Sequence, residues 1–110
     1  MVEDSSVLNR VYRALADPTR RRLLVTLREG EARISDLAAP LPLSFAAVAQ
    51  HIAALEEAGL IEREVRGREH WLSVRANGLR EAETWIAEQS SSWNARADAL
   101  GAHLERRGRK

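Results

Sequence analysis

Two places in the chain carry polar side chains whose type and spacing suit the binding of nucleic acid. Gln50 lies in a segment with helical spacing of apolar residues, and a glutamine amide can donate to and accept from one adenine edge at once. Arg66 and Arg68 flank Gly67, and a guanidinium group binds phosphate oxygens bidentately. The surrounding elements must therefore bring an amide and two guanidinium groups to one surface.

Other chemistries lack the residues that they need. The chain has no cysteine, which excludes disulfides, thiolate metal sites and thiol sensing. His51, His70 and His103 lie on different predicted elements without a second ligand at metal-binding spacing, so we expect no metal ion and no other cofactor. The sequence has no glycine-rich phosphate loop, nucleophile–base pair or carboxylate pair, so we expect that the protein is not an enzyme.

Size and composition predict one domain, 1–110. The chain has 110 residues, of which 45% are hydrophobic, and a net charge of +1 that does not by itself indicate a polyanionic partner. No apolar run has the length of a signal peptide or of a membrane-spanning helix, which needs about 18 residues. Together with the absence of cysteine, this predicts a cytoplasmic protein with no membrane partner.

The first two predicted helices carry clear start signals. A stripe of apolar residues over 5–16 predicts a helix that Ser5 or Ser6 caps. Asp17, followed by a proline, predicts the start of a second helix, which ends at Gly30.

The range 35–58 predicts a helix-turn-helix unit. Ser35 is predicted to cap a short helix that two prolines end, and Ser44 to cap a longer helix that reaches about Ala58. The second helix of such a unit can enter the major groove of DNA. Its predicted buried positions are Val48, Ile52 and Leu55.

The range 60–74 changes to a strand pattern and predicts a two-stranded hairpin. Gly67 supplies the positive φ of a tight turn, and Arg66 and Arg68 are predicted to project from the tip. Such a hairpin forms a wing beside the helix-turn-helix.

The range 79–106 predicts one long amphipathic helix of about 40 Å. The serines at 90–92 are weak helix formers, so a bend there stays open. A small core cannot cover this whole seam, so we expect 79–106 to form a homodimer together with 5–16. The seam consists of Leu79, Ala82, Ile86, Gln89, Trp93, Ala97, Leu100 and Leu104.

Taken together, the motifs resemble those of the ArsR/SmtB family of bacterial transcriptional regulators over about residues 7 to 104. The resemblance implies a mainly α-helical winged helix-turn-helix with a small β-hairpin. It also implies a homodimer that represses transcription from an imperfect palindrome of double-stranded DNA until a signal releases it. The family's metal sensing needs ligand sets that this chain lacks, so we expect metal-independent binding, and the sequence names no effector. The motifs are ALADPTRRRLL at 14–24, DLA at 36–38, LSFAAVAQHIAALEEAGLI at 43–61 and VRGREHWLSV at 65–74.

Two sets of site residues follow. His51 could equally pack inside the fold or bind a phosphate, and Trp85 and Trp93 could anchor the dimer or close the core of one chain. One of the arginines at 20–22 is expected to pair with an acid such as Asp17. The predicted DNA contacts are Ser44, Phe45, Ala46, Ala49, Gln50, His51, Arg66 and Arg68. The predicted dimer contacts are Val7, Val11, Leu15, Ile86, Trp93, Leu100 and Leu104.

One alternative function stays open. The face around Gln50 is unusually apolar, since Phe45, Ala46, Ala49 and Ala53 share it. A winged helix with such a face could bind a protein without contacting DNA bases.

Overall fold

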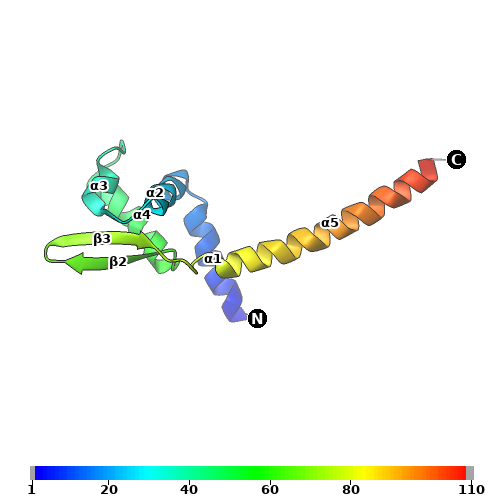
Figure 1. Cartoon of the computed structure of the whole chain (residues 1–110), viewed down its shortest axis with the longest axis horizontal. Helices are drawn as coiled ribbons and strands as arrows, with labels where there is room; N and C mark the ends of the chain where they lie inside the picture. The colour runs from blue at the N-terminus through cyan, green and yellow to red at the C-terminus, as the bar shows by residue number, and fades with distance from the viewer. Residues whose placement is uncertain (1, 109–110) are drawn as a thin grey trace. The chain divides into compact units, whose positions relative to one another are not determined.

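The computed structural model describes residues 2–108 and the side chains of residues 6–104. The chain divides between Leu79 and Arg80 into a first unit that contains the core and a second unit that is a single helix. Figure 1 labels the elements. In chain order they are α1 (Val2–Leu15), α2 (Pro18–Arg28), β1 (Ala32–Arg33), α3 (Ile34–Ala38), α4 (Phe45–Glu57), β2 (Ile61–Arg66), β3 (Glu69–Val74) and α5 (Arg80–Gly108).

Local capping chemistry sets the starts of α2 and α4, as the sequence predicted. The Asp17 carboxylate accepts a hydrogen bond of 3.1 Å from the backbone N–H of Arg20. The Ser44 hydroxyl accepts one of 3.1 Å from the backbone N–H of Ala47. Each bond satisfies an amide that the first turn of a helix leaves unpaired.

Two predicted caps are wrong. Helix α1 begins at Val2, so Ser5 and Ser6 lie inside the helix and neither is its N-cap residue. The N-cap of α3 is Arg33, whose backbone N–H donates to the Asp36 carboxylate at 3.4 Å, so Ser35 also lies inside its helix. In α3 the carboxylate three residues after the cap accepts from the N–H of the cap residue itself, as in one half of a capping box.

The hairpin of β2 and β3 turns at Gly67, whose φ of 65° confirms the predicted turn. The sequence prediction missed a third strand. Strand β1 pairs antiparallel with β3, with Arg33 opposite Trp71, so the sheet has the order β1-β3-β2. The third strand ties the base of the helix-turn-helix to the wing.

The core of the first unit lies between the helices and the sheet. Helix α1 packs on α2 and α4, while the sheet contacts α2, α3 and α4 (Figure 1). Val11 is 1% exposed within this core, so its predicted role as a dimer contact is wrong: helices of its own chain already cover it. The largest fully buried side chains are Leu23, Leu27, Ile52, Leu55, Leu72, Val11 and Val48.

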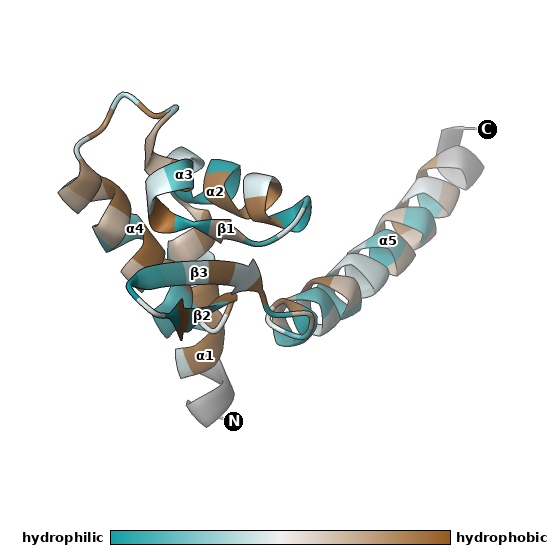
Figure 2. Cartoon of the chain, turned by 60° about the vertical axis from the view of Figure 1, so that its left-hand side comes forward, coloured by the Kyte–Doolittle hydropathy of each residue, from teal (hydrophilic) through white to brown (hydrophobic). Residues whose placement is uncertain are grey.

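Helix α5 is continuous through residues 90–92, so the bend that the serines left open does not occur. Its 29 residues correspond to a length of about 43 Å. Hydrophobic residues recur along it (Figure 2). None of the helices within residues 2–108 is both long and apolar enough to span a membrane.

Candidate nucleic-acid interface

Helix α4 presents one face to the core and another to solvent. Val48, Ile52 and Leu55 are fully buried, as predicted. The opposite face exposes Gln50 and 58% of Phe45. Ala46 and Ala53 are also exposed there, whereas Ala49 is half-buried. The amide of Gln50 is therefore accessible on a largely apolar helical face.

His51 is held inside the fold by α2. The Arg20 guanidinium donates from Nε to His51 Nδ1 at 3.1 Å and from Nη1 to the carbonyl of Arg13 at 3.0 Å. The Asp17 carboxylate lies 3.9 Å from the same ring nitrogen. The pKa of Asp17 is lowered, chiefly by the backbone hydrogen bond from Arg20. The Arg20 guanidinium therefore bonds a histidine and a carbonyl, while Asp17 accepts the backbone N–H of Arg20 and interacts with the guanidinium through its charge.

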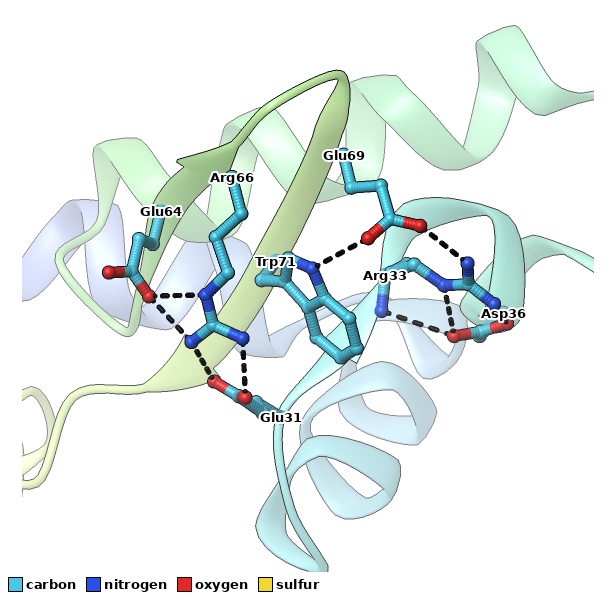
Figure 3. Close-up of polar contacts among 7 residues, drawn as sticks. All are labelled: Glu31, Arg33, Asp36, Glu64, Arg66, Glu69 and Trp71. Atoms are coloured by element: carbon cyan, nitrogen blue, oxygen red, sulfur yellow. Dashed lines mark hydrogen bonds and ion pairs between the residues drawn. The ribbon is translucent and has the colours of Figure 1, made fainter.

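Arg66 does not project from the tip of the wing. Its guanidinium donates to both oxygens of Glu31 at 2.9 Å, and to Glu64 at 2.9 and 2.6 Å. It also lies over the ring of Trp71, 5.0 Å from the centroid (Figure 3). The hydrogen bond from Arg66 lowers the pKa of Glu31, so the pair stays ionised near neutral pH.

A second arginine lies near the same tryptophan. Arg33 donates to Asp36 at 3.1 and 3.2 Å and to Glu69 at 2.7 Å, and its guanidinium carbon is 5.8 Å from the Trp71 centroid. Glu69 also accepts a hydrogen bond from the indole N–H at 3.3 Å. Figure 3 shows these contacts on one side of Trp71 and the Arg66 contacts on the other.

We call these seven side chains the tryptophan cluster, and it joins the segment before α3 to both strands of the wing. Cation–π contacts and bidentate ion pairs favour particular orientations of the side chains. The cluster therefore links the wing to the start of the helix-turn-helix through side-chain contacts on both sides of Trp71. One signal in the sequence could have revealed it, because Glu64 with Arg66 and Glu69 with Trp71 are spaced two apart on their strands and so share a face. The members are Glu31, Arg33, Asp36, Glu64, Arg66, Glu69 and Trp71.

Arg68 differs from the other arginines of the wing. Arg63 is held by the Glu56 carboxylate at 2.6 and 3.1 Å, and Arg66 by the cluster. Within the described part of the chain Arg68 has no hydrogen bond or ion pair, and its side chain is exposed. Arg68 thus offers its guanidinium donors to solvent or to a ligand.

A hollow of about 200 Å³ lies between α3, the start of α4 and the wing turn. It lies between the exposed Phe45 at the start of α4 and Arg68. Its lining includes Arg33, Ser35, Phe45, Arg68, Glu69 and His70.

The predicted dimer contacts other than Val11 are at least partly exposed. Val7 is exposed and Leu15 is half-buried. The four predicted contacts on α5 are each more than half exposed: Ile86, Trp93, Leu100 and Leu104. Trp85 on the same helix is also exposed. Among the side chains of residues 6–104 no group of three or more metal ligands comes together.

A helix-turn-helix whose second helix has an accessible face, beside a β-hairpin wing, places the protein in the winged helix-turn-helix class, in which the second helix can enter the major groove of DNA. Residues 17–63 match the family model described as bacterial regulatory protein, arsR family. A crystal structure of an ArsR family transcriptional regulator is 36% identical with a TM-score of 0.77, over 82% of this chain and 93% of that one. An ArsR-like transcriptional regulator from Rhodococcus sp. RHA1 is 30% identical with a TM-score of 0.81, over 96% of both chains.

The chain belongs to the ArsR family of DNA-binding transcriptional regulators, which confirms the resemblance found in the motifs. The transcriptional repressor SdpR of Bacillus subtilis is 28% identical over 72% of this chain and 88% of its own length. The regulator CmtR of Mycobacterium tuberculosis is 44% identical over 58% of this chain, and the match spans 54%, about half, of CmtR. These relatives are regulators and not enzymes, in agreement with the prediction.

Proposed function

We propose that the protein is a homodimeric, metal-independent repressor that binds an imperfect palindrome near promoters in the cytoplasm. The observation that carries the proposal is the accessible face of α4 around Gln50, beside a wing whose tip has an unpaired arginine. Family membership supports a regulator that binds DNA over a module that binds only protein. Two copies are needed because the two half-sites of a palindrome require two reading helices.

In this proposal α4 lies in the major groove. The Gln50 amide pairs with an adenine, while Phe45, Ala46 and Ala49 make apolar contacts with groups such as a thymine methyl. Ser44 lies beside a phosphate at the start of the helix and also caps it. Because so few polar groups face the bases, the shape of the DNA carries part of the specificity.

Two of the predicted DNA-contacting residues already have partners within the fold, so we propose that they support DNA binding indirectly. His51 is bound by Arg20 and Arg66 by Glu31 and Glu64, so neither is free to bind a phosphate without losing partners. We assign them the positioning of α4 and of the wing, and assign the phosphate contact of the wing to Arg68.

Binding of the purified protein to a fragment of its own promoter region tests the proposal. We expect a labelled fragment to bind with an affinity that falls steeply between about 50 and 200 mM salt, and to bind equally with EDTA present. Indifference to DNA at low salt would contradict the proposal and favour the protein-binding alternative. Loss of binding in EDTA would contradict metal independence alone.

Replacing Gln50 tests the base contact. Gln50→Ala should cost about 1–3 kcal/mol of discrimination at one A·T pair in each half-site. Asn77→Ala is the matched control, because it removes an exposed amide from the turn after β3. Equal discrimination by both variants would remove Gln50 from the base contacts.

A further inference from the structure

The hollow between α3, α4 and the wing turn has the size of a site for a small group. Its volume of about 200 Å³ lies below the roughly 300–1,000 Å³ of pockets that enclose drug-sized ligands. The kind of group that the hollow can bind depends on which hydrogen-bond donors in its lining have no partner among the described residues.

Arg68 is the first free donor. It lines the hollow, and none of the residues described in the structure pairs with its guanidinium. The other arginine in the lining, Arg33, is occupied by Asp36 and Glu69. An anion that enters the hollow therefore meets one unpaired positive charge.

His70 is a second donor, because of its own partner. Arg63 Nη1 lies 3.1 Å from His70 Nδ1, and a guanidinium group can only donate. Nδ1 is therefore the acceptor, and the ring proton lies on Nε2. Arg63 is itself held by the bidentate Glu56 carboxylate, which keeps the imidazole in this tautomer. His70 is thus a residue of the lining whose Nε2–H takes part in no hydrogen bond within the described residues.

The one carboxylate in the lining is already satisfied. Glu69 Oε2 accepts from Arg33 at 2.7 Å, and Oε1 accepts from the indole of Trp71 at 3.3 Å. The hydrogen bond from Arg33 lowers the pKa of Glu69, so this carboxylate stays ionised and held by Arg33, which it shares with Asp36. The exposed Ser35 hydroxyl lies in the same lining and adds a third donor.

We propose that this hollow binds one phosphodiester group of the DNA backbone, through the Arg68 guanidinium, the His70 Nε2–H and the Ser35 hydroxyl. The inference rests on the proposed function. Phe45 is both the first residue of α4 and part of the lining, so a phosphate bound here lies beside the start of the helix that contacts the bases. Such a contact sets the register of α4 in the groove, because phosphate contacts position a protein on the duplex.

The test combines single methylphosphonate substitutions, which remove one backbone charge each, with protein variants. Scanned along the bound fragment, the wild-type protein should lose roughly 10-fold or more in affinity at one backbone position per half-site, as expected for hydrogen bonds to a charged group. In Arg68→Ala the methylphosphonate at that position should lower the affinity by less than about 2-fold, because the positive charge that pairs with the phosphate is already gone. Ser35→Ala and His70→Phe should each reduce the penalty in part.

Arg75→Ala serves as the matched control. Arg75 is exposed and follows β3 at the end of the hairpin away from the turn, so this variant should keep the full wild-type penalty at that position. Thermal unfolding of Arg68→Ala should match wild type, since no described contact is lost.

Two results would overturn the inference. If every methylphosphonate costs the same in wild type and Arg68→Ala while both bind DNA, no phosphate lies in the hollow and the proposed function stands. If inorganic phosphate binds saturably without DNA, depends on Arg68, and displaces DNA more than chloride at equal ionic strength, the hollow is a site for a free anion. If the wild-type protein does not bind DNA at all, the proposed function is contradicted, and the inference that rests on it is contradicted as well.

Discussion

Trp93 offers the sharpest test of dimerisation through α5. Its side chain is 75% exposed in the single chain. A tryptophan can bury about 150–250 Å², so a partner that covers the exposed part removes about 110–190 Å² from water in each copy. At about 25 cal/mol per Å² this corresponds to about 3–5 kcal/mol per copy. Ordering the side chain costs about 0.5–1.5 kcal/mol, which leaves about 2–4 kcal/mol.

Trp93→Ala removes this contribution from both copies of a symmetric dimer. We therefore expect its dimer dissociation constant to rise by at least roughly 1,000-fold, which corresponds to about 4 kcal/mol, the lower limit for the two copies together. Sedimentation equilibrium across nanomolar to micromolar protein measures the change. Ser91→Ala is the matched control, because residues two apart on a helix do not share a face and Ser91 is exposed.

Two results would refute the reasoning. A dissociation constant within about 3-fold of wild type for Trp93→Ala would mean that α5 does not bury this residue between copies. A wild-type chain that sediments as a monomer at micromolar concentration would remove the dimer, and with it the palindrome model.

Three further predictions concern the turn after the wing, the tryptophan cluster and its arginine. A Cβ at Gly78 would lie 2.5 Å from the carbonyl oxygen of Gly59. Gly78→Ala should therefore cost about 1–3 kcal/mol of stability and lower Tm by roughly 4 °C or more. Gly101→Ala is the control and should not lower Tm, because a Cβ at Gly101 meets no atom within 4 Å. The hydrogen bond from Arg66 lowers the pKa of Glu31 from 4.5, so the ionised carboxylate stabilises the folded state. This stabilisation is complete above about pH 4.5 and is lost as the pH falls through the lower pKa of the folded state. The Tm difference between wild type and Glu31→Gln should therefore be constant above about pH 5 and shrink below it, and a difference that grows in acid would contradict the pairing. Finally, Arg66→Ala should weaken DNA binding without changing its salt slope, whereas loss of a direct phosphate contact would lower the slope by about 0.9 per contact.

Much of the fold was predictable because its signals are local. Asp17 and Ser44 cap helices through amides three residues away, and Gly67 supplies a positive φ within its own turn. The buried face of α4 follows from helical periodicity alone. The accessible face around Gln50 could be predicted for the same reason, since it is the opposite face of that helix.

The rest of the site depends on residues that are distant in sequence. Arg66 and Glu31 are 35 positions apart, and Arg33 and Glu69 are 36 apart. No periodicity links such pairs, and strand β1 is only two residues long, so its pairing with β3 leaves no pattern to detect. The prediction therefore treated Arg66 as equivalent to Arg68.

The sequence by itself determined the order of the helices and of the two wing strands, the caps of α2 and α4, the turn of the wing and the family, because each depends on neighbouring residues or on a contiguous motif. Only the tertiary structure decided which side chains are available. It placed Val11 in the core of its own chain, paired His51 with Arg20, and bound Arg66 to two carboxylates while leaving Arg68 free. The physical reason is that a charge is neutralised, or a surface covered, by whichever group the fold brings within contact distance, and that group can come from any part of the chain.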